Sequence, residues 1–453
     1  MALKSSLSLI AGAPATPPGA STGPRAPLSR VAAGTFVLRV CHLGLTFLIG
    51  LALARLLGAG GYGAFAYAIS WVTLLVVPAQ LGFNKLLVRE VAGSLAKGDW
   101  AHLRGIVRLA DGLVLAVALI AAGLAVGLSY WLPVGDAQMA GCFRLGMALL
   151  PLMALVHIKR ATLEGLHRVR TGQLPEMVIH PLALLTLVVL GWAWLGPGLT
   201  ARLALTAAVV AVGLAALVAA VAVHQLLPRE ATAQPPRYAF RAWLSSALPF
   251  MAIGAMTVIT NRTDVVMLGL LRGAADAGVY EIAVRLARLV PFALFVLNSV
   301  VAPQLAQFHA EGQHASMQRT LTRAAHWSLA LALPAAVVFW VAGEVVLGIF
   351  GPAFAGGYMA LAILAGGQLV NVAAGCSGHT LMMGQRERDA AYALVLAVML
   401  NVSLNLALIP PYGIEGAAVA TSISLVVWKL LMVRQVVRRL GLNPTALAWG
   451  ARS

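Results

Sequence analysis

Long apolar segments dominate this chain, and short clusters of glycine, proline and charged residues separate them. A helix needs about 20 largely apolar residues to cross the hydrocarbon core of a bilayer. The chain of 453 residues is 60% hydrophobic and 10% charged, whereas ordinary globular domains are roughly 25% charged. This composition excludes a soluble protein. Twelve segments reach spanning length, near residues 31–57, 63–84, 107–132, 140–164, 174–195, 201–226, 244–271, 277–302, 324–350, 358–383, 390–409 and 415–436.

The order of these segments predicts an all-α fold class. We expect a polytopic membrane protein with about twelve transmembrane helices in two six-helix lobes. The connection that joins the lobes contains Pro228, Pro235 and Pro236 together with three arginines, which is typical of a linker. The predicted domains are a disordered cytoplasmic tail (1–30), an N-terminal six-helix lobe (31–226), a cytoplasmic linker (227–242), a C-terminal six-helix lobe (243–440) and a cytoplasmic tail (441–453).

A weak internal repeat relates the two halves. An ungapped shift of the sequence superposes Gly58 and Gly63 on Gly273 and Gly278. A shift by six spans preserves orientation. The lobes are therefore expected to be parallel repeats related by a pseudo-twofold axis along the membrane normal, as in many alternating-access transporters.

The basic residues predict the orientation in the membrane. The chain carries 32 Lys and Arg against 15 Asp and Glu, a net charge of +17. Most of these bases fall in alternate connections and in the tails, and four fall at the opposite ends of the spans: Arg55, Arg144, Arg202 and Arg272. Cytoplasmic loops are enriched in Lys and Arg, so we expect both termini in the cytoplasm. Bases spread between apolar segments do not form the clustered face that binds nucleic acid, and no nucleic-acid partner is expected.

The chain lacks the motifs of several enzyme classes. It has no Gly-x-x-x-x-Gly-Lys-Ser/Thr loop for ATP and no His-Glu-x-x-His pair for zinc. Its three cysteines, Cys41, Cys142 and Cys376, form no Cys-x-x-Cys pair. We therefore expect no cofactor. Energy has to come from a gradient, a partner or the substrate, and protons and sodium ions are the candidate coupling ions.

The connections between the spans are too short to hold a catalytic domain. Those expected outside, such as 58–62 and 410–413, have only a few residues. Those expected inside, including the loops 85–104 and 303–322, are also short. The chain is thus expected to be a transporter and not an enzyme.

Three charged residues share one stripe of the eighth span. Glu281, Arg285 and Arg288 follow each other at i, i+4 and i+7 and so lie on one helical face. A charge at the bilayer centre costs at least about 2.5–3.5 kcal/mol, and it normally faces a bundle interior or a wet cavity. One interpretation is a cationic cavity wall, where arginine holds a phosphate through bidentate hydrogen bonds. The other is a structural lock, in which Glu281 and Arg285 pair and Arg288 reaches a carbonyl or an acid.

The seventh and first spans add further candidates. Arg262 and Asp264 are two residues apart and point to roughly opposite sides of their helix. Asp264 is either a proton or sodium site or an ionised structural partner. Arg39 and His42 share a face of the first span. By contrast, Glu176 lies near a span end where water reaches it, and we expect no special role for it.

Motifs along nearly the whole chain resemble those of one family. The stretch 409–421, Ile-Pro-Pro-Tyr-Gly-Ile-Glu-Gly-Ala-Ala-Val-Ala-Thr, resembles the C-terminal signature of polysaccharide biosynthesis flippases. The segments 56–66 and 88–90 resemble the first hairpin of that family, and 163–168 and 174–176 its middle region. The family belongs to the multidrug/oligosaccharidyl-lipid/polysaccharide exporter superfamily, whose multidrug extruders share part of the C-terminal signature.

The resemblance implies a V-shaped cavity between two lobes, lined by spans one, two, seven and eight. It implies a flippase of the cell inner membrane that moves polyprenyl-diphosphate-linked oligosaccharide units, of an O-antigen or exopolysaccharide, to the outer leaflet. A glycan polymerase and chain-length machinery are the expected partners besides membrane lipid. The lipid II flippases usually have fourteen spans, so twelve spans argue against that substrate.

Roles for the candidate residues follow from combining the charges with the resemblance. Diphosphate binding is assigned to four arginines: Arg39, Arg262, Arg285 and Arg288. Ion coupling or gating is assigned to Asp264, Glu281 and His42. Two alternatives stay open. A multidrug or small-cation antiporter requires an acidic or aromatic lining, and a membrane-embedded glycan polymerase or transferase requires a long outer loop.

Overall fold

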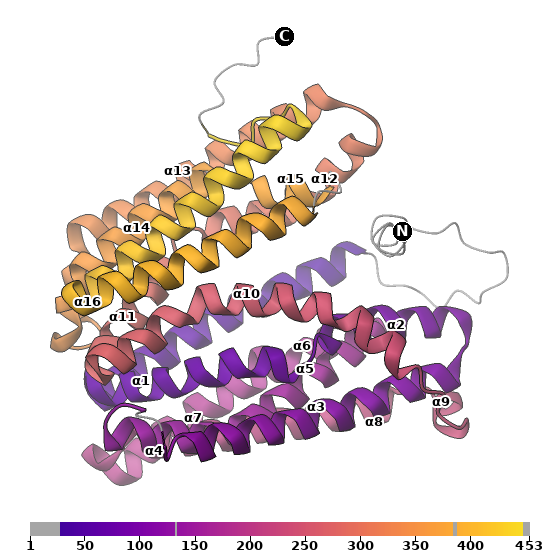
Figure 1. The fold of residues 1–453 in the computed structure, drawn as a ribbon, viewed down its shortest axis with the longest axis horizontal. Coiled ribbons are helices and arrows are strands. Elements are labelled where there is room, and N and C mark those ends of the chain that lie inside the picture. Colours follow the sequence, from indigo (N-terminus) through magenta and orange to yellow (C-terminus); the bar gives the residue numbers. More distant parts are fainter. Residues whose placement is uncertain (1–27, 132–133, 384–386, 447–453) are drawn as a thin grey trace.

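The structure is a computed structural model, and it describes residues 28–131, 134–383 and 387–446. Helices make up nearly all of this part of the chain, which contains no strand (Figure 1). The predicted all-α fold class is confirmed. The predicted N-terminal tail lies outside the described residues except for 28–30, which begin the first helix. The described part of the C-terminal tail docks on the bundle, where the Ala446 amide donates to the Ala373 carbonyl at 2.8 Å.

The helices of the N-terminal lobe are α1 (Leu28–Ala79), α2 (Phe83–Lys97), α3 (Trp100–Leu128), α4 (Ala137–Gly146), α5 (Leu149–Gly165), α6 (Val169–Leu174), the π-helical turn η2 (Pro175–Ile179), α7 (His180–Leu195), the short 3₁₀ turn η3 (Gly196–Gly198) and α8 (Ala201–Leu226). The linker carries α9 (Arg229–Ala233). The C-terminal lobe contains α10 (Phe240–Arg272), α11 (Ala274–Ala287), α12 (Phe292–Ala310), α13 (His314–Gly348), the 3₁₀ turn η4 (Pro352–Gly357), α14 (Tyr358–Ala373), α15 (Ser377–Met383) and α16 (Glu387–Leu440).

The helix lengths agree with a twelve-span layout. Nine helical segments of the described chain are long and apolar enough to cross a membrane. Two of them, Val37–Ala79 with 43 residues and Ala391–Leu440 with 50 residues, each have the length of two crossings. The eighth predicted span is divided between α11 and α12 and is not among the nine. Each of the twelve predicted segments is nevertheless helical, which is consistent with two lobes of six.

Several predicted connections are wrong, because the structure forms helix there. The expected loops 58–62 and 410–413 are reduced to single non-helical residues, Gly58 and Gly413, within α1 and α16. The expected loop 85–104 is mostly helix α2, and most of 303–322 belongs to α12 and α13. In α2 an amphipathic pattern accounts for the error: Leu87 and Val91 are fully buried one turn apart while basic residues face outward.

Glycines at equivalent turns reveal the internal repeat. Gly58, between spans one and two, has φ 67° and ψ 179°, and Gly273, between spans seven and eight, has φ 99° and ψ 179°. Gly196 and Gly413 end spans five and eleven with φ/ψ of 54°/−130° and 56°/−128°. Positive φ values of this kind favour glycine because it has no Cβ. The two lobes thus reverse direction in the same way at the same places.

The lobes meet where α1 packs against α10 and α11. A Cβ atom on Gly63 would lie 1.6 Å from the Ala274 carbonyl oxygen, and one on Gly278 would lie 2.3 Å from the Ala59 carbonyl oxygen. Glycines permit this close backbone approach between membrane helices. Gly63 and Gly278 are also the equivalent residues of the sequence repeat. The backbones of α1 and α11 therefore touch near the pseudo-twofold axis, at the end of the bundle marked by Gly58, which we call the hairpin end.

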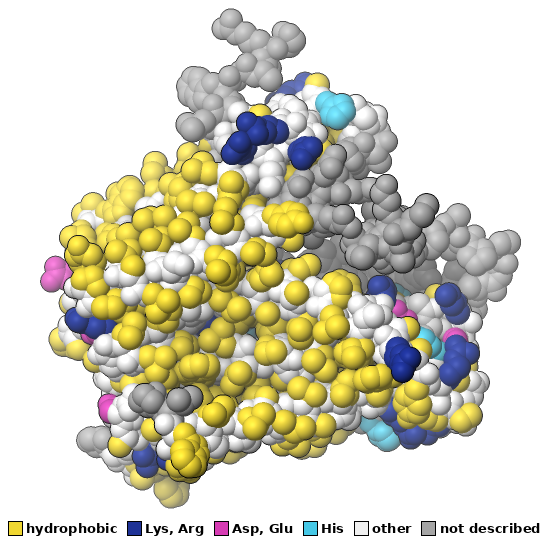
Figure 2. Space-filling model, viewed as in Figure 1, with side chains coloured by type: hydrophobic (Ala, Val, Ile, Leu, Met, Phe, Trp, Pro, Cys, Tyr) yellow, Lys and Arg dark blue, Asp and Glu magenta, His cyan; other side chains and the backbone are white. Residues whose placement is uncertain are grey.

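The surface shows which part of the molecule the bilayer surrounds. Hydrophobic side chains cover the middle of the helices, and Lys and Arg gather at the opposite end of the bundle, over α2 and α9 (Figure 2). We call this the basic end. At the hairpin end Trp131 and Trp194 are 88% and 89% exposed. Tryptophan is enriched at the level of the lipid headgroups, so these two residues indicate the boundary of the hydrocarbon layer.

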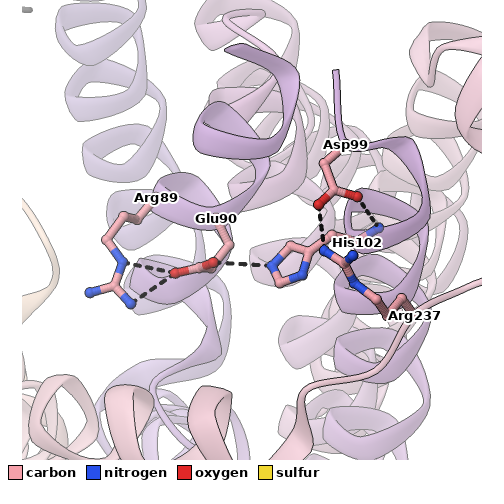
Figure 3. A network of polar contacts seen from close by, with 5 residues as sticks. All are labelled: Arg89, Glu90, Asp99, His102 and Arg237. Carbon is pink, nitrogen blue, oxygen red and sulfur yellow. Dashed lines mark hydrogen bonds and ion pairs between the residues drawn. The ribbon is translucent and has the colours of Figure 1, made fainter. Parts of the chain in front are cut away.

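At the basic end, the linker is bound to the N-terminal lobe (Figure 3). The Arg237 amide donates to the Ala101 carbonyl at 2.9 Å, and the Arg237 guanidinium forms an ion pair with the Asp99 carboxylate. Asp99 also caps α3, since its carboxylate accepts a 3.1 Å hydrogen bond from the His102 amide. One carboxylate therefore begins a helix and anchors the linker.

The same network extends to the first turn of α10. His102 Nε2 lies 3.2 Å from Glu90 Oε2, and Glu90 pairs with Arg89 at 2.9 Å. The His102 ring meets the ring of Trp243 edge-on, with 4.9 Å between centroids. Trp243 is 3% exposed. The linker and the start of α10 are both held against α2 and α3.

We predict that Asp99→Ala loosens the linker. Loss of a helix N-cap costs about 0.5–2 kcal/mol, and here the ion pair to Arg237 is lost as well. Hydrogen exchange of residues 234–239 should become faster. Asp136→Ala is the matched control, because Asp136 caps α4 through the Met139 amide at 2.7 Å and does not contact the linker. Equal exchange in the two variants would contradict the anchoring role.

Acid should have the same effect on the linker. The hydrogen bond from the His102 amide, and after it the charge of Arg237, hold the pKa of the Asp99 carboxyl below its usual range. The stabilisation is complete above the unfolded pKa of about 3.9 and is lost as the pH falls through the lower pKa of the folded state. Exchange of residues 234–239 should therefore accelerate below about pH 4, beyond the ordinary pH dependence that an unstructured peptide of the same sequence shows. Asp99→Asn should remove this extra acceleration, and its persistence would assign it to another group.

Candidate functional site

A cluster of charged side chains lies between α10 and α11 where these helices face α1. Arg262 Nη1 donates to both Glu281 oxygens, at 3.2 and 3.4 Å, and Arg285 lies 3.8 Å from the same carboxylate. Glu281 is 5% exposed. The single-residue turn at Gly273 folds α11 back along α10 and so brings Arg262 opposite Glu281. We call Arg262, Glu281, Arg285 and Arg288 the arginine cluster.

Arg285 extends the cluster to the other lobe. Its Nη1 donates a 2.8 Å hydrogen bond to the backbone carbonyl of Thr46 on α1. A Cβ atom on Gly50 would lie 2.0 Å from the same nitrogen, so the guanidinium occupies space that a larger residue would fill. The contact joins a charged side chain of the C-terminal lobe to the backbone of the N-terminal lobe.

Arg288 is the exposed member of the cluster. Its Nη2 reaches the Asn261 carbonyl at 3.4 Å, and the side chain interacts electrostatically with Arg262, Glu281 and Asp264. It is exposed although its neighbours are buried or half-buried. Three arginines and one glutamate leave an excess of positive charge. The forked guanidinium suits the oxygens of a phosphate.

Asp264 lies next to the arginine cluster, but its hydrogen bonds come from two hydroxyl groups and a backbone amide. Its carboxylate accepts hydrogen bonds from the Tyr280 hydroxyl at 2.8 Å, the Val265 amide at 2.9 Å and the Thr421 hydroxyl at 3.3 Å. Asp264 is 2% exposed and Tyr280 is fully buried. Because Thr421 belongs to α16, the acid joins three helices of the C-terminal lobe. Neither Tyr280 nor Thr421 was among the residues that we selected from the sequence, since neutral hydroxyls in apolar spans give no signal of their own.

The two candidates on α1 do not join the arginine cluster. The Arg39 guanidinium lies 5.2 Å from the ring centroid of Phe295 on α12, a cation–π contact. His42 Nδ1 lies 3.2 Å from the Met177 carbonyl on η2, in the N-terminal lobe. Although they share a helical face, the two side chains contact different lobes. Four of the seven selected residues form the arginine cluster and Asp264 lies next to it on α10, whereas these two contact other elements.

A second polar cluster, which the sequence did not predict, lies in the N-terminal lobe. Arg160 pairs with Glu164 at 2.8 Å and with Glu176 at 2.9 Å. His157 lies 3.8 Å from Glu176, and its ring accepts from the Gln80 amide at 2.6 Å. The i, i+4 spacing of Arg160 and Glu164 was a visible signal. Glu176 was dismissed because it lies near a span end, whereas the structure turns it toward α5.

No group of three or more His, Cys, Asp or Glu side chains within the described ranges is arranged to hold a metal ion.

Comparison with known proteins gives the context for this geometry. Residues 31–309 match the family model described as polysaccharide biosynthesis protein, and residues 249–407 match the model described as MatE. Among curated proteins, the chain is similar to a probable low-salt glycan biosynthesis flippase, Agl15, of Haloferax volcanii. The two are 24% identical over 403 residues, which cover 88% of this chain and 81% of the relative. A probable flippase of the same organism, AglR, is 25% identical over 193 residues, 42% of this chain and 40% of that protein.

Solved structures share the fold. An inward-facing multidrug resistance MATE family transporter superposes with a TM-score of 0.71 at 13% identity, covering 88% of this chain and 94% of that one. The lipid II flippase MurJ in an inward closed conformation superposes with a TM-score of 0.69 at 13% identity, covering 90% of this chain and 87% of that one.

We predict that Tyr280→Phe destabilises the C-terminal lobe. Removing the hydroxyl leaves the buried Asp264 carboxylate with one donor fewer, which costs about 1–3 kcal/mol. The melting temperature of the purified protein in detergent should fall. Tyr238→Phe is the control, because Tyr238 is 54% exposed and should tolerate the change. Equal melting temperatures for the two variants would show that the Tyr280 hydroxyl contributes little.

Proposed function

Because the chain belongs to the polysaccharide biosynthesis protein family, we propose that it is a flippase for polyprenyl-diphosphate-linked oligosaccharides. It moves repeat units of an O-antigen or exopolysaccharide from the inner to the outer leaflet by alternating access of its two lobes. The twelve-span architecture and the similarity to named flippases support this proposal. The protein translocates its cargo without changing a covalent bond, so it is not an enzyme.

The observation that carries the proposal is the arginine cluster at the contact between the lobes. A diphosphate has two adjacent groups of anionic oxygens, and arginine forks match this pattern. Arg288 is exposed and has only one hydrogen bond in the described structure, to a backbone carbonyl at 3.4 Å. It meets the anion first. Arg262 and Arg285 lie behind it on either side of Glu281.

The contact of Arg285 with α1 suggests how binding moves the lobes. Its guanidinium donates to the Thr46 carbonyl, and a phosphate competes for the same donor with the advantage of full negative charge. When the diphosphate takes this hydrogen bond, the polar link between α11 and α1 is released. The substrate thereby favours separation of the lobes at the cluster, as a ligand does when it binds one state better than the other.

Coupling to an ion centres on Asp264. Its carboxylate, with the hydroxyl oxygens of Tyr280 and Thr421, offers oxygen atoms to a proton or a sodium ion. Glu281 and His42 act as gating partners, the first within the arginine cluster and the second against η2. Arg39 attracts the diphosphate from α1. No cofactor is required.

The basic end supports a proposed orientation of the flippase in the membrane. Lys and Arg concentrate there (Figure 2), and the positive-inside rule assigns that end to the cytoplasm. The protein is thus a multi-pass protein of the cell inner membrane, with both termini cytoplasmic. The glycan polymerase and its chain-length machinery are its functional partners, because they consume the units delivered outside.

A second candidate function is a multidrug antiporter. It is favoured by the MatE match over residues 249–407 and by the shared fold of MATE transporters. Such a transporter carries cations, and Arg262, Arg285 and Arg288 repel them. The excess positive charge therefore favours the anionic cargo.

Depletion of the protein in its native cell tests the proposal. Completed lipid-linked oligosaccharides should accumulate and face the cytoplasm, as measured by mass spectrometry and by their protection from an enzyme added outside. Arg285→Ala and Arg288→Ala should reduce surface glycan at least about tenfold, the effect of losing roughly 1.4 kcal/mol of binding. Arg272→Ala is the control, because Arg272 pairs with Asp276 at the hairpin end. Unchanged lipid-linked pools and unchanged surface glycan after depletion would contradict the flippase and favour the antiporter.

A further inference from the structure

A polar cavity of about 250 Å³ opens near the basic end of the N-terminal lobe. Its lining residues come from α2, α5 and η2; α2 and α5 are labelled in Figure 1. Six of its lining residues are polar: Asn84, Lys85, His157, Arg160, Glu164 and Glu176. Among the described residues that line it there is no Phe, Tyr or Trp ring. Its volume is below the roughly 300–1,000 Å³ of pockets that enclose drug-sized ligands, so it admits a small polar group.

The backbone is adapted to place Glu176 in this cavity. Pro175 has no amide hydrogen, and the helix widens there into one turn of π-helix, Pro175–Ile179. Such π-turns interrupt α-helices frequently at functional sites. Arg160 holds Glu176 from one side and Glu164 from the other. The two carboxylates are thus fixed on one wall.

The cavity presents both donors and acceptors that the protein leaves unused. Asn84 Oδ1 accepts from the Lys85 amide at 2.8 Å, but neither Asn84 Nδ2 nor Lys85 Nζ has a hydrogen-bond partner among the described residues. On α5, Glu164 Oε1 accepts hydrogen bonds from Arg160 and Gln173. Glu164 Oε2 has no hydrogen-bond partner within the described chain.

His157 adds one more hydrogen-bond donor that points in a defined direction. Its Nδ1 accepts from the Gln80 amide at 2.6 Å, so in the neutral ring the proton is on Nε2. That nitrogen lies 3.8 Å from Glu176 Oε1, too far for a hydrogen bond. A ligand hydroxyl group lying beside both atoms, about 2.8 Å from each, would accept from Nε2 and donate to Oε1.

The charges of the cavity balance, which separates it from the arginine cluster. Lys85 and Arg160 are offset by Glu164 and Glu176. A neutral cavity gives no advantage to a phosphate, and a described lining without Phe, Tyr or Trp gives none to an apolar cation. Alternating donors and acceptors match the hydroxyl groups of a carbohydrate, each of which both donates and accepts.

We propose that this cavity is the subsite for a sugar ring of the lipid-linked cargo, formed by Asn84, Lys85, His157, Arg160, Glu164 and Glu176. The proposal rests on the proposed function and adds to it, because it assigns the sugar to the N-terminal lobe and the diphosphate to the C-terminal lobe.

Helix α1 places the two subsites within reach of one substrate. His42 contacts the carbonyl of Met177, the residue after Glu176. One helical turn away, the Thr46 carbonyl accepts from Arg285 of the arginine cluster. Four residues of helix rise about 6 Å. A substrate whose diphosphate binds the arginines therefore carries its first sugars past α1 toward the cavity, and it contacts both lobes at once.

Binding of two lipids distinguishes the subsites. The full-length protein in nanodiscs is titrated with lipid-linked oligosaccharide extracted from the native cell and with bare polyprenyl diphosphate, and native mass spectrometry measures both complexes. Asn84→Ala removes an unused donor, and Val88→Phe fills the cavity from α2. Each should weaken binding of the sugar-bearing lipid about tenfold and leave binding of the bare diphosphate unchanged. Ala96→Phe, at an exposed position of the same helix, should change neither.

The outcomes separate this proposal from the function on which it rests. Loss of binding for the sugar-bearing lipid alone supports the subsite. Unchanged binding of both lipids in Asn84→Ala and Val88→Phe, with wild-type melting temperatures, overturns it and leaves a structural ion-pair cluster. Equal weakening of both lipids also overturns it, since the cavity then acts on the diphosphate or on the fold. If the wild-type protein binds neither lipid, the proposed function itself is wrong.

Discussion

Charges that lie within a bilayer have to find partners in the protein, because the hydrocarbon offers no water. This constraint organises both polar regions of the molecule. Glu281 is enclosed by two arginines, and Glu176 and Glu164 share a third, Arg160. After these ion pairs are assigned, the polar groups without a strong partner indicate where a ligand can bind. The exposed Arg288 and the unused donors and acceptors of the second cavity are the groups that the fold does not need for itself.

The glycine turns explain how a repeated chain builds a single interface. Gly58 and Gly273 reverse the chain with the same backbone geometry, and Gly63 and Gly278 then bring α1 and α11 into direct contact. Further along α1, the absence of a side chain at Gly50 leaves room for Arg285 to lie against the backbone of this helix. Small residues thus create the place where a large cation bridges the lobes.

The sequence predicted the architecture well because hydrophobic length is a strong signal, and twelve predicted segments are helical. It failed at features that depend on tertiary contacts. Helix α2 was expected to be a loop because its apolar face is short and mixed with bases. Glu176 was set aside as a residue near a span end, since sequence distance does not show that a π-turn directs it to Arg160. In the same way, the sequence could pair Glu281 with Arg285 but could not reveal the stronger contact with Arg262.

The docking of the linker has a mechanical consequence. Since Arg237 contacts Asp99 and Ala101 and Trp243 contacts His102, the linker and the first turn of α10 are attached to the start of α3 in the N-terminal lobe. Further along, α10 carries Asp264, which is bonded to α11 and α16 of the other lobe. A rocking motion must therefore be absorbed as bending within α10, where Pro249 removes a backbone hydrogen bond. In the proposed alternating-access cycle, the bending stiffness of α10, more than the length of the linker, would thus limit how far the lobes separate.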